Sequence, residues 1–372
     1  MINVDRKNKT ITIIACYFGH KMGLGVYMEN LFEYLLPHLI SSGYHVNLIT
    51  NKTIKEQIKI DTQIDIIHTK WLDRILYSKL YLLFILPFLP VIKKSKYLFF
   101  PFNPVVGPFS RNAIVVIHDL NEFAIERKYG FLKTLFRKKI VEWTLKNSKK
   151  IIAISHFTKQ QIETYFPEIK NENKIQVIHN GIHFDRNSLL LSQAASRTPY
   201  LLIVGRIDPK AKKLYESVKI FNSYKTYHPD FRLKIVGTYN DFCKVEALEF
   251  LRYIEQFDSI DYLGYIEDNE LDILYKEAYA TLFFSEFEGF GFPLLEAFYR
   301  ECPVITNTEN LVNDELSSGL DIKVHQSEIE NAEIVNEKIN SAKYISKVQL
   351  KAVAESFSWK KSAELYYKAF NY

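Results

Sequence analysis

The sequence predicts an α/β protein built from two domains, each with a parallel sheet. Its 372 residues exceed the length that one hydrophobic core normally supports. In both halves, apolar runs rich in β-branched residues alternate with amphipathic stretches, a pattern typical of parallel strands covered by helices. With 47% hydrophobic and 24% charged residues, the composition indicates a folded globular chain and excludes a disordered one.

In the first half, β-branched runs predict strands, and longer amphipathic runs between them predict helices. A helix over residues 27–36 should end near Pro37, because proline lacks the N–H that a helix interior needs. A second helix is predicted over residues 131–147. The predicted strands are residues 10–16, 45–50, 64–68, 113–118, 150–154 and 174–179.

The second half repeats this scheme, so two Rossmann-like sheets are expected. Residues 185–199, which read DRNSLLLSQAASRTP, lack a strand pattern and predict a linker between the halves. We therefore place the first domain at residues 1–190, together with a helix at 357–372, and the second at residues 191–356. The predicted strands of the second domain are residues 200–204, 232–236, 261–262, 280–284 and 303–306.

Cysteine and charge distribution limit the cellular setting. Cys16, Cys243 and Cys302 show neither metal-ligand nor redox spacing, which favours a reducing, cytoplasmic compartment. Residues 1–200 hold 28 Lys and Arg against 15 Asp and Glu, whereas residues 201–372 hold 20 against 28. The basic half indicates an anionic partner or, alternatively, solvated helix surfaces. Nucleic acid is not expected, because no known reader motif accompanies the charge.

One apolar run, residues 80–92, reads LYLLFILPFLPVI and is interrupted by Pro87 and Pro90. It is shorter than the roughly 20 residues that a membrane-spanning helix needs. Two interpretations stay open. One is a buried or partly buried element, and the other is a segment that touches lipid, which the lysines directly after the run favour.

The most informative stretch is residues 284–307, FSEFEGFGFPLLEAFYRECPVITN, where a strand leads through a glycine-bearing loop into a helix. Pro293 suits the first helical turn, where a missing N–H costs nothing. The backbone amides of Gly289, Phe290 and Gly291 should point with the helix N-terminus at one spot beyond the strand. This arrangement predicts an anion site that fits a diphosphate.

Two carboxylates, Glu288 and Glu296, flank this spot eight positions apart. Carboxylates accept hydrogen bonds from vicinal sugar hydroxyls. A Gly-x-Gly loop alone is equally typical of a tight turn with close packing. The glutamate pair favours a ligand site.

A second candidate segment is residues 202–214, LIVGRIDPKAKKL, in which a strand ends at Gly205 and Arg206 follows at once. Lys212 and Lys213 stand just before the next predicted helix. Cations at a strand's carboxyl end stabilise the charge that grows on a departing diphosphate. The alternative interpretation is a solvated basic turn.

The first half offers two further candidates. Gly23 and Gly25 are predicted in the loop between the first strand and the first helix, where glycines allow a backbone to approach a ligand. His118 ends another predicted strand, where an imidazole can donate to a sugar hydroxyl or to the incoming acceptor. A purely structural role is the alternative for this histidine.

Taken in order, these segments resemble the large retaining glycosyltransferase family four of GT-B fold. The resemblance extends over nearly the whole chain, and the Glu-x7-Glu segment containing GFGFP is its most specific part. The matching motifs are GLG (23–25), IHDL (117–120), AISHFT (153–158), VIHNGI (177–182), VGRID (204–208), LGYIEDNEL (263–271), EGFGFPLLEA (288–297) and FSWKKSA (357–363).

The resemblance implies two Rossmann-like domains that face a central cleft, with the C-terminal helix returning to the first domain. The stretch after Arg206 is about one residue longer than the common family pattern, so either Lys212 or Lys213 is the diphosphate lysine. His179 stands where many relatives have the proline of VIPNG. The implied contacts are Glu288 with donor-sugar hydroxyls, Glu296 with the ribose, Arg206 and one lysine with the diphosphate, the amides of Phe290 and Gly291 with the pocket, and His118 with the sugar.

The resemblance also implies an activity. A hexose of mannose, glucose or galactose type would pass from a nucleotide-diphosphate sugar to a saccharide or polyprenyl-diphosphate-linked saccharide, with retention, in cell-surface polysaccharide biosynthesis such as that of lipopolysaccharide. No cofactor or metal is expected, since the chain contains no Asp-x-Asp. The basic half and the apolar run extend the expectation to peripheral contact with the anionic inner face of the cell membrane. Alternatives are a GT-B sugar-nucleotide epimerase or hydrolase, and an inactive sugar-nucleotide-binding scaffold subunit.

Overall fold

The computed structural model divides the chain into two compact units. The first unit comprises Met1–His183 and Phe357–Tyr372, and the second comprises Phe184–Ser356. Residues 185–197 of the predicted linker lie outside the described residues. The structure describes residues 9–16, 24–57, 64–74, 77, 80–102, 112–120, 123, 131–172, 174–182 and 198–371.

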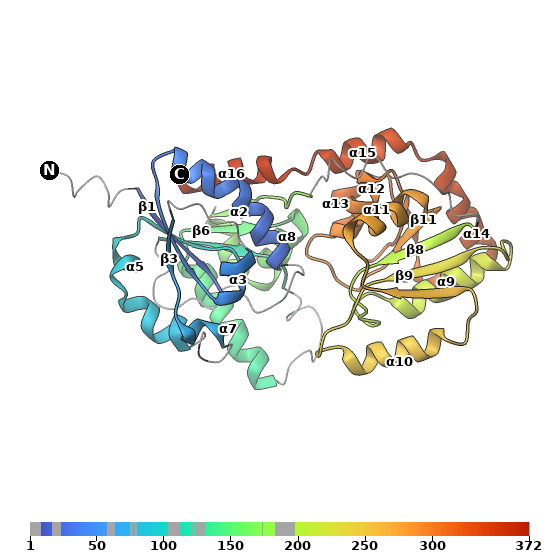
Figure 1. Cartoon of the computed structure of the whole chain (residues 1–372), viewed down its shortest axis with the longest axis horizontal. Helices are drawn as coiled ribbons and strands as arrows, with labels where there is room; N and C mark the ends of the chain where they lie inside the picture. Colours follow the sequence, from blue (N-terminus) through green and yellow to red (C-terminus); the bar gives the residue numbers. More distant parts are fainter. Residues whose placement is uncertain are drawn as a thin grey trace. The chain divides into compact units, whose positions relative to one another are not determined.

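The first unit contains a seven-stranded sheet in the order β3-β2-β1-β4-β5-β6-β7 (Figure 1). Every pair of neighbouring strands is parallel. All six strands predicted for this half are present. The strands are β1 (Thr10–Ala15), β2 (His45–Thr50), β3 (Ile64–Ile67), β4 (Tyr97–Phe100), β5 (Ala113–Ile117), β6 (Lys150–Ala153) and β7 (Ile175–Val177).

The sequence pattern missed β4, which pairs with β1 on one side and β5 on the other. Its four residues read YLFF, and all are buried. A strand covered on both faces has no polar residue at every second position, so periodicity does not reveal it.

The helices of the first unit include one that is longer than predicted. Helix α2 (Leu24–Ser41) continues through Pro37, which is exposed. Water can therefore hydrate the carbonyl that the proline leaves without a donor, while Leu35, Leu36 and Leu39 hold the last turns against the core. The other helical segments are α3 (Lys52–Gln57), η1 (Lys70–Asp73), η2 (Tyr81–Ile85), η3 (Leu86–Phe88), α5 (Pro90–Lys94), α7 (Phe131–Asn147), α8 (His156–Tyr165), η5 (Pro167–Glu172) and α16 (Trp359–Asn371).

The C-terminal helix α16 packs against α2 within the first unit, where Figure 1 shows the two ribbons side by side. The hydroxyls of Tyr27 and Tyr366 lie 2.7 Å apart in a hydrogen bond, and both side chains are buried. Gly181 passes so close to the start of α16 that a Cβ there would lie 2.1 Å from the Trp359 nitrogen. The helix therefore completes the first unit although more than 170 residues of the second unit precede it.

The second unit contains a six-stranded parallel sheet in the order β10-β9-β8-β11-β12-β13. Each of these strands was predicted except β13, a three-residue edge strand too short to show a pattern. The strands are β8 (Tyr200–Val204), β9 (Arg232–Val236), β10 (Ile260–Gly264), β11 (Ala280–Phe283), β12 (Val304–Asn307) and β13 (Ile322–Val324). The helical segments are α9 (Leu214–Lys225), α10 (Lys244–Ile254), α11 (Asp268–Glu277), α12 (Phe292–Tyr299), α13 (Val312–Ser317), η7 (Gln326–Glu328), α14 (Ala332–Asn340), η8 (Ser341–Tyr344) and α15 (Lys347–Glu355).

Two glycines end the neighbouring strands β8 and β9 in close contact. Gly237 has φ +141°, and a Cβ added to it would lie 1.8 Å from the Gly205 carbonyl oxygen. Only glycine fits this position, because any side chain would push the two strand ends apart.

We expect Gly237→Ala to lower the free energy of unfolding of the second unit by at least about 3 kcal/mol. Denaturant unfolding followed by circular dichroism measures the change. Gly264→Ala is the matched control: Gly264 also ends a strand at positive φ, but nothing lies within 4 Å of its added Cβ. It should cost only about 1–2 kcal/mol. Equal losses in the two variants would contradict the close approach.

Candidate functional site

The candidate site of the second unit lies where β8 and β11 end. These strands pair in parallel, with Leu201 opposite Ala280, so the loops after them leave the same edge of the sheet. Two hydrogen bonds join the loops: the Ala211 carbonyl accepts from the Glu286 amide at 2.9 Å and from the Ser285 hydroxyl at 3.0 Å. The loop after β8, which carries Arg206 and Lys212, is therefore held against the loop after β11, which carries Glu288.

Lys212 and Glu288 form an ion pair between the two loops. The side chains are 21% and 15% exposed, so both are largely withdrawn from water. Lys212 and Arg206 also line one small pocket at the end of β8. The structure thus brings together the carboxylate and one of the two candidate lysines that the sequence analysis singled out.

The second candidate lysine, Lys213, has a different environment. Its backbone is left-handed, with φ +43°, and its Nζ lies 3.8 Å from a carboxylate oxygen of Glu309. The Asn307 amide donates to the same carboxylate at 2.9 Å. Lys213 therefore forms an ion pair with Glu309, while Lys212 forms one with Glu288.

Arg206 is positioned by a neighbour that the sequence analysis did not single out. Its guanidinium donates to Asp208 Oδ2 at 2.9 Å, and Asp208 Oδ1 accepts from the Ala211 amide at 3.2 Å. Arg206 is 39% exposed, so its remaining donors are open to a ligand. Both residues belong to the VGRID motif, so Asp208 could have been named from the sequence as a partner of Arg206.

The glycine loop forms the N-terminus of α12. Gly291 is the N-cap, with φ +113°, and Pro293 stands in the first turn as predicted. Phe290 is buried and its ring lies 5.2 Å from that of Phe292, whereas Gly289 is half-buried. This geometry directs the first helical amides toward the loop that carries Glu288.

Glu296 is supported by a network of polar side chains. Its Oε2 accepts a hydrogen bond from the Tyr275 hydroxyl at 3.3 Å, and its backbone carbonyl accepts from Arg300 at 3.1 Å. Arg300 is paired with buried Asp272. Burial raises the pKa of the Glu296 carboxyl, and Arg300 and the Tyr275 hydroxyl oppose that shift. The motif alone gave no sign of these partners, because Asp272 and Tyr275 lie on α11.

In the first unit, His118 follows β5 and is buried. Its Nε2 lies 2.8 Å from the Pro101 carbonyl oxygen, which can only accept, so Nε2 carries the proton. The ring meets Tyr27 edge-on at 4.5 Å between centroids. Burial lowers the pKa of the imidazole to about 4, although the bond to Pro101 opposes the shift. The neutral ring therefore donates to Pro101, and its Nδ1 is an acceptor.

The His118 pKa predicts a pH-dependent stability. An unfolded imidazole titrates near 6.5 and this one near 4, so between these values the unfolded chain binds more protons and falling pH destabilises the fold. When the pH falls from about 7 to about 5, protonation of His118 in the unfolded chain should lower the free energy of unfolding by about 2 kcal/mol. Denaturant titrations at both pH values should show a smaller pH-dependent loss in His118→Gln. An identical loss in both proteins would contradict the assignment.

The glycines predicted in the first loop have different outcomes. Gly23 lies outside the described residues. Gly25 was predicted in a loop, but it is buried in the first turn of α2, which begins at Leu24. The sequence analysis placed the helix start too late because two nearby glycines are typical of a loop, whereas Gly25 is accommodated in the buried first turn of the helix.

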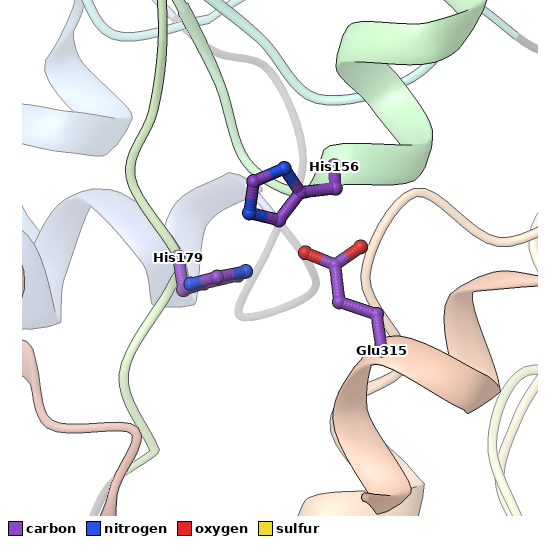
Figure 2. A group of neighbouring side chains, drawn as sticks. All are labelled: His156, His179 and Glu315. Atoms are coloured by element: carbon purple, nitrogen blue, oxygen red, sulfur yellow. The ribbon is translucent and has the colours of Figure 1, made fainter.

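Two histidines of the first unit lie near each other after β6 and β7 (Figure 2). The ring centroids of His156 and His179 are 5.8 Å apart. The His179 ring also meets Phe357 at 5.5 Å, and its carbonyl accepts from Ser362 in α16 at 2.6 Å. His179, which replaces the family's proline, thus helps to bind the C-terminal segment to the first unit. The third side chain drawn, Glu315, belongs to α13 of the second unit.

Comparisons with known proteins find matches in both halves of the chain. A model described as "Glycosyltransferase Family 4" matches residues 28–186, and one described as "Glycosyl transferases group 1" matches residues 192–347. The chain belongs to glycosyltransferase family four. Its two parallel sheets are those of the GT-B fold, as the resemblance implied.

Curated relatives of this family-four chain include the O-antigen chain mannosyltransferase RfbU of Salmonella typhimurium, 28% identical over 240 residues. That alignment covers 63% of this chain and 64% of RfbU. The serotype-specific mannosyltransferase WbdA of Escherichia coli is 27% identical over 176 residues, 43% of this chain and 21% of WbdA. The chain thus spans less than two thirds of the curated relatives it matches first.

Solved structures share the fold over almost the whole family-four chain. Sucrose-phosphate synthase from Thermosynechococcus elongatus superposes with TM-score 0.68 at 16% identity, covering 98% of this chain and 99% of that one. The lipopolysaccharide outer core galactosyltransferase WaaB has TM-score 0.62 at 15% identity, covering 97% and 98%. Anabaena HepE in complex with UDP and glucose has TM-score 0.64 at 13% identity, covering 97% and 99%.

Proposed function

We propose that this protein is a retaining glycosyltransferase that moves a hexose from a nucleotide-diphosphate sugar to a saccharide acceptor. The observation that carries the proposal is the gathering of Arg206, Lys212 and Glu288 at the joined ends of β8 and β11, in a chain of family four. Cations and a sugar-binding carboxylate at one sheet edge are what a sugar diphosphate requires.

In the proposed reaction the acceptor oxygen bonds to the anomeric carbon on the face from which the diphosphate departs. The acceptor proton passes to the leaving phosphate oxygen, so no protein nucleophile is needed. Arg206 and Lys212 stabilise the negative charge that accumulates on the diphosphate. Glu288 orients the sugar hydroxyls, and Glu296, held by Tyr275, orients the ribose.

Mannose is the first candidate for the transferred sugar, because the relatives with significant sequence identity are named as mannosyltransferases. The name of RfbU favours an O-antigen acceptor. We propose that this acceptor is a polyprenyl-diphosphate-linked saccharide of lipopolysaccharide biosynthesis. Glucose and galactose remain in the proposal, since HepE was solved with UDP and glucose and WaaB is named as a galactosyltransferase.

The test is incubation of the purified chain with radiolabelled GDP-mannose, UDP-glucose or UDP-galactose and a polyprenyl-diphosphate-linked saccharide. Transfer of label to the lipid fraction, with retained anomeric configuration by NMR, supports the proposal. Conversion of the sugar nucleotide without acceptor would instead indicate an epimerase or hydrolase. Binding of the donor without any turnover would indicate a scaffold subunit.

We also expect transfer to be independent of divalent metal. Two side-chain cations, Arg206 and Lys212, line one pocket at the end of β8, and we propose that they stabilise the diphosphate charge there in place of a metal ion. Initial rates should therefore be the same with excess chelator and with added manganese or magnesium. Loss of activity in chelator that manganese restores would overturn this part of the proposal.

A further inference from the structure

An exposed apolar surface lies on the first unit between residues 71 and 88. Phe88 is 72% exposed, Phe84 66% and Trp71 51%. We call this set the apolar surface, and its members are Trp71, Tyr77, Leu80, Phe84, Ile85 and Phe88. So many large apolar side chains in contact with water in one short stretch indicate an interaction site.

The apolar surface is one side of a segment whose other side belongs to the core. Tyr81, Leu82 and Leu86 are buried in the core cluster that covers the sheet of the first unit. Leu80, Phe84 and Phe88 in the same segment are exposed, so the segment has a core side and a solvent side. The buried side chains therefore anchor the segment in the core, and the exposed aromatic side chains are available to a partner.

The positive charge of the chain near the apolar surface indicates what kind of partner would bind there. The sequence has no Asp or Glu between Asp73 and Asp119, while it has six Lys and Arg. Lys93, Lys94 and Lys96 directly follow the apolar surface and are exposed. Asp73 itself is paired with His68 at 2.9 Å. An anionic partner is favoured, because cations outnumber carboxylates along this part of the chain.

At the other end of the segment, cations and aromatic rings lie together. Lys70, Trp71, Arg74 and Tyr77 line one pocket together with Asp73. The Trp71 and Tyr77 rings are 5.5 Å apart, and the Arg74 guanidinium lies 5.9 Å from the Tyr77 centroid. Trp and Tyr prefer the headgroup level of a bilayer, where Lys and Arg meet lipid phosphates.

We propose that the apolar surface docks on a lipid bilayer with anionic headgroups. Phe84 and Phe88 enter the acyl boundary, Trp71 and Tyr77 lie at the headgroups, and the lysines after Ile92 meet the phosphates. The chain lies on the membrane, and among the described residues no helix is long and apolar enough to cross one. Docking needs no sugar nucleotide, so its test is independent of the proposed function.

The test is flotation of the full chain with vesicles of phosphatidylglycerol and phosphatidylcholine in equal amounts, without substrate. The wild-type protein should float with them at low salt and bind pure phosphatidylcholine far less. Phe84→Ser/Phe88→Ser should weaken partitioning at least about tenfold at any salt. Lys93→Gln/Lys94→Gln should weaken it about tenfold at low salt and much less at high salt.

Matched controls change equally exposed residues elsewhere. Phe242→Ser/Val245→Ser removes two exposed apolar side chains of the second unit, and Lys360→Gln/Lys361→Gln removes two exposed cations of α16. Neither control should change partitioning by more than about twofold. The proposal is overturned if wild type fails to float, if the control variants weaken binding equally, or if Phe84→Ser/Phe88→Ser instead dissociates a dimer.

Discussion

Replacing Glu288 with Gln is expected to lower kcat/KM for sugar transfer by about two to three orders of magnitude. The substitution keeps the shape of the side chain but removes the charge that pairs with Lys212. It also replaces one of the two acceptor oxygens with an NH2 donor, so one of two vicinal sugar hydroxyls can no longer donate a hydrogen bond to the side chain. Steady-state kinetics with labelled donor, at saturating acceptor, give the change.

Glu286→Gln is the matched control for this prediction. Glu286 stands two residues earlier on the same loop, and its side chain is exposed. It is held through its backbone amide, which the substitution leaves in place. Activity within about twofold of wild type is expected. A Glu288→Gln enzyme as active as this control would remove Glu288 from the proposed site.

Lys212→Ala should reduce kcat/KM by about a hundredfold or more, whereas Lys213→Ala should reduce it less than about tenfold. The structure gives the reason: Lys212 contacts Glu288 and lines the pocket with Arg206, while Lys213 is held by Glu309. The two substitutions remove the same charge from adjacent positions, so each serves as the control of the other. The opposite ranking would assign the diphosphate to Lys213.

The Lys212–Glu288 ion pair predicts that the effects of the two substitutions do not add. A double variant, Lys212→Ala with Glu288→Gln, should lose less activity than the product of the two single losses, because each single change already breaks the pair. Strict additivity would indicate that the two side chains act on separate parts of the substrate.

Most of the fold could be predicted because the strands carry β-branched runs between clear helical patterns. The missed strands show where that signal ends: β4 is an aromatic run buried on both faces, and β13 is three residues long. The end of α2 was wrong at Pro37 for a different reason. Core packing of the surrounding leucines outweighed a local rule, since the proline lies on the solvent side.

The candidate site was predictable in its loops but not in its supports. Glycines, carboxylates and cations in two short motifs identified the residues around β8 and β11. Their partners come from distant parts of the sequence. The Tyr275 hydroxyl of α11 donates a hydrogen bond to Glu296, and Glu309 forms an ion pair with Lys213. Such pairs depend on how helices pack on the sheet, which local patterns do not encode. For the same reason, only the structure separates Lys212 from Lys213.

We propose that a sugar diphosphate binds at the joined ends of β8 and β11. A crystal structure of the chain with a bound nucleotide sugar tests this binding site most directly. The diphosphate should lie within hydrogen-bond distance of Arg206 and Lys212. The ribose hydroxyls should contact Glu296, and Glu288 should turn from Lys212 to the sugar. A nucleotide bound at another edge of the sheet, with the Lys212–Glu288 pair intact, would contradict it.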